Sequence, residues 1–233
     1  MWRTRRTRRI TVGQEQWTTV DEYFSAQLIG EDEVLSAALA AADRAGLPQI
    51  AVAPNQGKLL HLLARTAGAK RILEIGTLGG YSTIWLGRAL PADGRLISLE
   101  IDPRHAEVAR QNLELAGLGK QAEVRLGRAA DTLAALDAEG VEPFDFYFID
   151  ADKVSNPDYV VWAIEHAHPG TLIVVDNVVR GGAVADADST DPSVLGTRRL
   201  HDELAASDRV TATSVQTVGT KGYDGFTLIR VER

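Results

Sequence analysis

The stretch that decides the fold of this 233-residue chain reads Leu73-Glu74-Ile75-Gly76-Thr77-Leu78-Gly79-Gly80-Tyr81-Ser82. An apolar, strand-like run passes through a glycine-rich turn into a helical pattern that begins at Tyr81. Glycines let the backbone approach a ligand without a β-carbon in the way, and the N-terminus of the following helix offers free N–H groups. The stretch therefore predicts a ligand-binding turn between a strand and a helix.

The glycine spacing and the next acidic residue narrow the kind of ligand. Gly79 and Gly80 follow Gly76 by three and four residues, which is neither Gly-x-Gly-x-x-Gly nor a phosphate loop ending in Gly-Lys-Ser/Thr. Glu100 ends the next apolar run, where an acid can accept hydrogen bonds from the ribose hydroxyls of an adenosine. Together they indicate an adenosine-containing cofactor, NAD or S-adenosylmethionine. The alternative is that the turn only caps the following helix and that Glu100 is a solvated side chain.

From residue 70 onward, short β-branched or apolar runs alternate with helical stretches, which predicts an α/β fold with helices on both faces of a doubly wound, mainly parallel sheet. The last two strands have no room for a helix between them, so one should run antiparallel. The expected strands are 71–75, 95–99, 122–126, 146–149, 172–175, 210–214 and 226–231. The expected helices are 81–90, 103–116, 129–136, 157–166 and 194–206, preceded by a helical extension at 20–45, broken at Gly30, and at 54–66.

Polar residues end two of these strands. Asp150 follows the strand 146–149, and Asp176 and Asn177 follow the strand 172–175. Open α/β sheets bind ligands at the carboxyl ends of their strands, and two carboxylates with an amide oxygen suit Mg²⁺. Lys153 lies three residues past Asp150, where it could serve as a base for a bound hydroxyl. The alternatives are a helix cap at Asp150, a turn at Asp176 and Asn177, and an exposed charge at Lys153.

Composition restricts the compartment and the partners. The chain has no cysteine, which removes disulfides, thiolate metal sites and a cysteine nucleophile, and its apolar runs are strand-sized, so we expect a cytoplasmic protein without a membrane span. The net charge is −7, and five arginines within residues 1–9 contribute +5, which leaves −12 for the rest. Such an acidic body makes nucleic acid an unlikely partner. We expect residues 1–15 to form a basic, disordered arm and residues 16–233 a single domain; the alternative for the arm is a nucleic-acid or membrane tether.

These residues resemble the cation-dependent O-methyltransferases, a family that includes catechol and caffeoyl-CoA O-methyltransferases and many small bacterial enzymes. The resemblance covers about residues 54–231 and rests on the stretch 73–82, on Leu99-Glu100-Ile101-Asp102-Pro103, on Phe148-Ile149-Asp150-Ala151-Asp152-Lys153 and on Asp176-Asn177-Val178. The Asp-Ala-Asp-Lys form is similar to the caffeoyl-CoA and bacterial members more than to the catechol members.

The resemblance implies a Rossmann-like, seven-stranded sheet in the order 3-2-1-4-5-7-6 and a homodimer. It implies that S-adenosylmethionine contacts Val52, Glu74, Gly76, Thr77, Gly80, Tyr81, Ser82, Glu100, Gly127, Arg128, Ala129 and Asp150. Of these, Gly76 and Ser82 would hold the methionyl part, Glu100 the ribose, and residues 127–129 the adenine. It also implies a divalent cation, Mg²⁺ with Mn²⁺ or Ca²⁺ as alternatives, on Asp150, Asp176 and Asn177, and catalytic roles for Lys153 and Asp150.

The implied reaction is transfer of a methyl group from S-adenosylmethionine to a hydroxyl of a catechol-like small molecule, a phenol with two neighbouring hydroxyls. Two other functions remain compatible with the residues alone. A nicotinamide-dependent oxidoreductase could use the same fold, and an RNA-binding relative of the methyltransferases would draw support from the arginines of residues 1–9.

Overall fold

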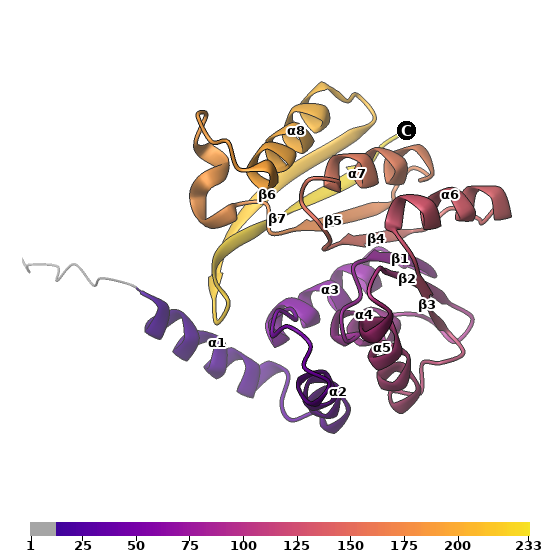
Figure 1. The fold of residues 1–233 in the computed structure, drawn as a ribbon, viewed down its shortest axis with the longest axis vertical. Helices are drawn as coiled ribbons and strands as arrows, with labels where there is room; N and C mark the ends of the chain where they lie inside the picture. Colours follow the sequence, from indigo (N-terminus) through magenta and orange to yellow (C-terminus); the bar gives the residue numbers. More distant parts are fainter. Residues whose placement is uncertain (1–12) are drawn as a thin grey trace, which may run out of the picture.

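The computed structural model describes residues 13–233, which form one seven-stranded sheet in the order β3-β2-β1-β4-β5-β7-β6 (Figure 1). This is the expected order, and β7 runs antiparallel to both of its neighbours while the other pairings are parallel. The strands are β1 Arg71–Ile75, β2 Arg95–Glu100, β3 Ala122–Leu126, β4 Phe146–Ile149, β5 Leu172–Asp176, β6 Val210–Gly219 and β7 Gly222–Val231.

Helices cover both faces of the sheet (Figure 1). Every residue of β4 is buried, as expected for a parallel strand that packs against helices on both sides. One apolar core lies between the sheet and helices α2 to α5, and a second lies between the sheet and helices α6 to α8. The helices are α1 Gln14–Leu28, α2 Glu33–Arg44, α3 Pro54–Thr66, α4 Tyr81–Gly87, α5 Pro103–Leu115, α6 Ala129–Glu139, α7 Asn156–Glu165 and α8 Pro192–Ala206.

The two C-terminal strands are longer than the sequence predicts. They pair along their whole length, from Val210 opposite Val231 to Gly219 opposite Gly222, around a tight turn at Thr220 and Lys221. Most of β6 is exposed at the sheet edge, so it lacks the apolar alternation that would have revealed residues 215–219 as strand. Between β5 and α8, Arg180–Ala185 forms a short 3₁₀-helix, η1.

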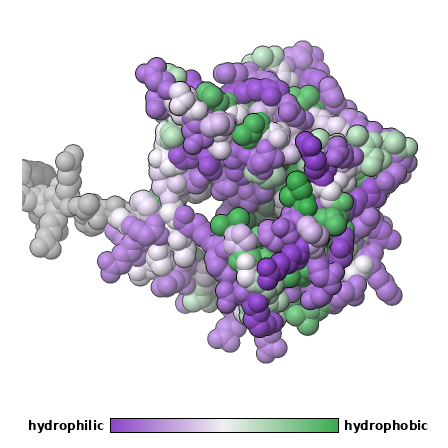
Figure 2. All heavy atoms as spheres, in the orientation of Figure 1, coloured by the Kyte–Doolittle hydropathy of each residue, from purple (hydrophilic) through white to green (hydrophobic). Residues whose placement is uncertain are grey.

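The N-terminal extension begins earlier than predicted. Helix α1 starts at Gln14, so residues 14 and 15 are helical and do not belong to an arm. The rest of the predicted basic arm, residues 1–12, lies outside the described residues. Figure 2 shows a mainly hydrophilic face with small hydrophobic patches around a hollow near the centre of the view. No helix within residues 13–233 is long and apolar enough to cross a bilayer.

The register of the parallel strands brings the predicted site residues to one edge of the sheet. Ile75 lies opposite both Leu99 and Ile149, and Ile149 lies opposite Val175. The next residue along each strand therefore lies at the same height in the sheet. These residues are Gly76, Glu100, Asp150 and Asp176. The residues predicted to bind cofactor and metal therefore lie together at the carboxyl edge of the sheet.

Candidate cofactor and metal site

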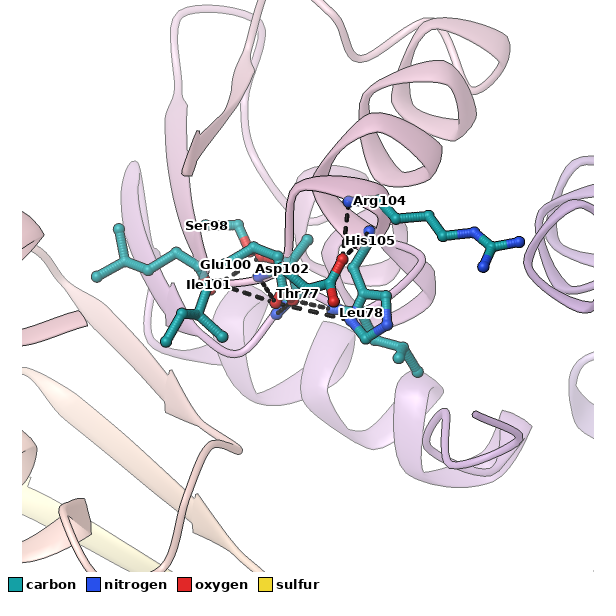
Figure 3. Close-up of polar contacts among 9 residues, drawn as sticks. Thr77, Leu78, Ser98, Glu100, Ile101, Asp102, Arg104 and His105 are labelled. Atoms are coloured by element: carbon teal, nitrogen blue, oxygen red, sulfur yellow. Dashed lines mark hydrogen bonds and ion pairs between the residues drawn. The ribbon is translucent and has the colours of Figure 1, made fainter. Parts of the chain in front are cut away.

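Glu100 organises the glycine-rich turn (Figure 3). Its Oε2 accepts backbone N–H groups from Leu78 at 2.8 Å and Thr77 at 3.3 Å, and its Oε1 accepts those of Ile101 and Asp102, both at 2.9 Å. An ionised carboxylate has about four acceptor positions, so these bonds occupy all of them. A ribose hydroxyl that donates to Glu100 must therefore compete with a backbone amide, and the long bond from Thr77 is the weakest of the four.

Glu74 lies beneath the turn, fully buried, and is held by side chains. Its Oε1 accepts from the Ser82 hydroxyl at 2.6 Å, and its Oε2 accepts from the hydroxyls of Ser98, at 2.6 Å, and Thr83. Burial raises the pKa of Glu74 to about 7, although the three hydroxyls oppose the rise. This arrangement differs from the predicted role of Glu74 as a direct cofactor ligand, because both of its oxygens already accept hydrogen bonds inside the protein.

Gly76 joins the residues predicted to hold the cofactor (the cofactor half: the turn 76–82 and Glu100) to those predicted to hold a cation (the metal half: Asp150, Asp176 and Asn177). Its φ is +99°, and a β-carbon there would lie 2.1 Å from the carbonyl oxygen of Asp150. The Asp150 N–H donates to the carbonyl of Ile75 at 2.9 Å, which continues the β1–β4 pairing to this point. Only glycine permits both this backbone conformation and this approach, so Gly76 is required by packing as well as by any ligand.

The other predicted cofactor residues surround the same edge. Gly127 N–H donates to the Glu100 carbonyl at 2.8 Å, which places the turn of Gly127, Arg128 and Ala129 beside the end of β2. Gly80, with φ +79°, is the N-cap of α4. A cavity of about 170 Å³ lies next to the turn, and Val52, Leu78, Gly79 and Tyr81 are among its lining residues. Thr77 points inward instead, bonded to Ser98 at 2.6 Å.

The predicted metal ligands come together at the ends of β4 and β5. Asp176 is 4% exposed, and its Oδ1 accepts the N–H of Asn177 at 2.8 Å. Burial, and then the negative charge of Asp150, raise the pKa of Asp176 well above its usual range. Asp150 Oδ1 accepts from Lys153 Nζ at 2.8 Å, and Lys153 is itself 8% exposed.

This donor set suits a hard divalent cation. Two neighbouring carboxylates, one of them buried, repel each other and lose solvation, and a cation placed between them offsets both costs. Asn177 has φ +56°, a left-handed conformation that Asn adopts more readily than most residues. Within residues 13–233, no three His, Cys, Asp or Glu side chains lie close enough together to hold a metal ion. A cation site at Asp150 and Asp176 therefore needs the Asn177 amide oxygen as its third protein ligand.

Gln56 is a site residue that the sequence did not reveal. It lies in the first turn of α3, and its Nε2 donates to Asp176 Oδ2 at 2.6 Å. The two residues are 120 positions apart, and glutamine near a helix start is unremarkable, so no local pattern signals the contact. The structure thus adds a third element, α3, to the predicted pair of strand ends.

Comparisons with known proteins agree with this geometry. A family model described as O-methyltransferase matches residues 24–232. The catechol O-methyltransferase of Niastella koreensis is 53% identical over 214 residues, which are 92% of this chain and 97% of that protein. The O-methyltransferase of Bacillus cereus, solved in complex with SAH, has a TM-score of 0.93 at 52% identity and covers 94% of this chain and 100% of that one. TomG, an O-methyltransferase of Streptomyces achromogenes solved with SAM, has a TM-score of 0.92 at 55% identity, with 95% and 100% covered.

The strand order and the glycine-rich turn held by Glu100 define a Rossmann-like methyltransferase fold. The chain belongs to the O-methyltransferase family, and it transfers the methyl group of S-adenosylmethionine to a hydroxyl group. The resemblance found in the sequence is confirmed, and the nicotinamide-dependent alternative is wrong.

Proposed function

We propose that this enzyme methylates one hydroxyl of a catechol-like phenol, with a divalent cation held by Asp150, Asp176 and Asn177. The observation that carries the proposal is the buried Asp176 carboxylate, which lies next to a second carboxylate at the sheet edge where the cofactor turn also lies. The name of the Niastella koreensis relative supports the acceptor class.

The chain's own residues have three tasks in this reaction. The cofactor turn and Glu100 hold the donor, and the ligands hold the cation, which would lower the pKa of a bound hydroxyl and fix its oxygen. Lys153 Nζ lies 2.8 Å from Asp150 Oδ1, so a hydroxyl bound at Asp150 is within reach of this amine. We assign the acceptance of the hydroxyl proton to Lys153, which takes this proton as a neutral amine and becomes the ammonium. Alignment of the oxygen with the methyl group supplies much of the remaining rate enhancement.

A cavity beside the metal ligands suits the ring of the acceptor. It measures about 190 Å³, and its lining includes Gln56, which contacts Asp176, and Phe226, which pairs with Asp176 in the sheet. Leu59 and Val218 add apolar surface to the same cavity. An aromatic ring on this surface would bury apolar area while its two neighbouring hydroxyls face the ligands.

The test is a methyl-transfer assay with S-adenosylmethionine and three acceptors: catechol, phenol and an aliphatic alcohol. We expect transfer to catechol in the presence of Mg²⁺, loss of transfer in EDTA, recovery when Mg²⁺ is restored in excess, and little transfer to the other two acceptors. Undiminished transfer in EDTA would contradict the cation, and equal transfer to phenol would contradict recognition through two hydroxyls.

We also propose that the enzyme is a homodimer, as its family resemblance implies. Tyr23 and Leu28 of α1 are 61% and 70% exposed, and a second copy could cover such apolar side chains. Light scattering coupled to size exclusion would give a mass near twice 25.2 kDa, whereas a monomer mass at micromolar concentration would refute the dimer.

A further inference from the structure

A chain of hydrogen bonds connects the N-terminal helix α1 to the Asp176 carboxylate. Thr220 N–H donates to Asp21 Oδ2 at 2.7 Å, and Asn55 Nδ2 donates to Asp21 Oδ1 at 2.9 Å. Asn55 Oδ1 accepts the N–H of Gln56 at 2.9 Å, and Gln56 Nε2 donates to Asp176 Oδ2 at 2.6 Å. Three segments distant in sequence, α1, the start of α3 and the β6–β7 turn, are thus joined to one predicted metal ligand.

Asp21 is the buried residue of α1 and bonds this helix to two other segments. It is 9% exposed, whereas the neighbouring apolar residues Tyr23 and Phe24 are 61% and 47% exposed, so polar contacts do more than apolar burial to hold the helix. Both Asp21 oxygens are used, because Oδ2 also accepts from the Thr220 hydroxyl at 3.1 Å. A β-carbon at Gly219 would lie 2.3 Å from this oxygen, so the glycine lets the turn close on Asp21.

Gln56 suits the task of holding a metal ligand. Asp176 Oδ2 is a buried acceptor, and leaving it without a donor would be costly. The Gln56 amide supplies that donor without a positive charge, so it orients the carboxylate and does not repel a cation. Asn55 in turn fixes the backbone N–H of Gln56 and is itself held by Asp21.

We infer that Gln56 is a positioning residue for the cation, and that α1 contributes to cation binding through Asp21 and Asn55. This inference rests on the proposed cation site. Groups that orient metal ligands typically change metal affinity by 10- to 100-fold when they are removed. Helix α1 then has a role in the chemistry although its own side chains need not touch the cation or the cofactor.

The test measures Mn²⁺ binding to the full chain by calorimetry, with neither acceptor nor S-adenosylmethionine present. We expect Gln56→Ala to raise the Kd for Mn²⁺ by about 10- to 100-fold and Asp21→Ala to raise it by a smaller factor, because Asp21 acts through two further bonds. The double variant should bind no more weakly than Gln56→Ala alone, since both changes act on one bond to Asp176. Excess Mn²⁺ should restore kcat in Gln56→Ala, which a general loss of structure would not allow.

The matched control is Gln111→Ala. Gln111 is an exposed glutamine on α5 that donates to the Glu107 carboxylate at 2.8 Å, so the change removes the same kind of bond away from the site. It should leave the Kd for Mn²⁺ unchanged, and all variants should keep their affinity for S-adenosylmethionine. If Asp21→Ala fails to fold, Asn55→Ala breaks the same chain with a smaller loss of contacts.

Wild-type affinity in Gln56→Ala would overturn the inference while leaving the proposed function intact. Additive losses in the double variant would overturn the connection to α1. Absence of Mn²⁺ binding by the wild-type chain would overturn the cation site itself, and the inference with it.

Discussion

Glu100 and Asp176 are buried carboxylates at the same edge of the sheet, and the protein holds them in different ways. Glu100 accepts four backbone N–H groups, two from the turn after β1 and two from the residues directly after Glu100 itself. Asp176 accepts one backbone N–H, from Asn177, and one side-chain amide, from Gln56 on α3. Backbone donors are present whatever the side chains are, whereas a side-chain donor exists only if the right residue occupies one distant position.

The difference predicts where each half of the site is vulnerable. The cofactor half depends on backbone conformation, so its sensitive positions are the glycines and Glu100 itself. The metal half depends on side chains at the ends of β4 and β5 and on α3, and α3 is in turn bonded to Asp21 of α1. Substitutions far from the chemistry should therefore disturb cation binding more readily than cofactor binding.

The largest expected effect is that of Asp150→Ala, which tests whether the two halves are separable. Loss of a cation ligand should lower kcat/KM for catechol by about 10³-fold or more, since metal activation contributes several kcal/mol and each 1.36 kcal/mol is tenfold. The backbone contact between Gly76 and Asp150 does not need the carboxylate, so the affinity for S-adenosylmethionine should change little.

Initial rates and calorimetry on the same preparation measure both quantities, with Asp188→Ala, an exposed aspartate, as the control. A parallel loss of cofactor affinity would show that the halves are one unit and that the comparison of Glu100 with Asp176 is wrong.

The next largest effect should come from Lys153→Met, which keeps the length of a nearly buried side chain and removes its amine. We expect kcat to fall by about 10²- to 10³-fold, because general-base catalysis typically contributes this much. The Kd for S-adenosylmethionine should stay constant, and exposed Lys120→Met serves as the control. An unchanged kcat would mean that Lys153 does not accept the hydroxyl proton and that the metal half only binds the acceptor.

The sequence predicted those parts of the molecule whose signals are local. The turn 73–82, Glu100 at a strand end, and Asp150 and Asp176 at two more strand ends are each readable within a few residues, and the parallel topology then brings them together. Gln56 escaped because its partner is 120 positions away, and residues 215–219 escaped because an exposed edge strand carries no apolar pattern. Glu74 was expected to face the cofactor, but its three hydroxyl partners on α4 and β2 are apparent only in the folded chain.

Glu74 extends the comparison to a third buried carboxylate, held entirely by side-chain hydroxyls. Its pKa is about 7 in the folded protein and about 4.5 in the unfolded chain. Between these values the folded state binds a proton that the unfolded state has lost, so the free energy of unfolding falls as pH rises from about 4.5 to 7, by about 3 kcal/mol in total. Glu74→Gln removes this titration, and the three hydroxyls can rotate to suit an amide.

Urea unfolding of both proteins at pH 5 and pH 7.5 measures the effect, since titrations common to the two cancel in the difference. The variant should lose less stability than the wild type over this interval. Equal losses would mean that Glu74 stays ionised throughout, and that hydroxyl donors hold a charge as effectively as the backbone amides around Glu100.

The smallest expected effect is that of Glu100→Gln, which bears directly on the backbone-held carboxylate. An amide has one acceptor oxygen where the carboxylate has two, so two of the four backbone N–H groups lose their partner and the turn loses its fixed position. Hydrogen bonds to a charged group contribute about 1.5–3 kcal/mol, so the Kd for S-adenosylmethionine should rise by about 10- to 100-fold. The Kd for Mn²⁺ should not change, and Glu107→Gln on the exposed face of α5 should change neither value. An unaltered affinity for S-adenosylmethionine would mean that the glycines position the turn without Glu100. A loss of Mn²⁺ affinity would mean that the turn also supports the metal half, through the contact of Gly76 with Asp150.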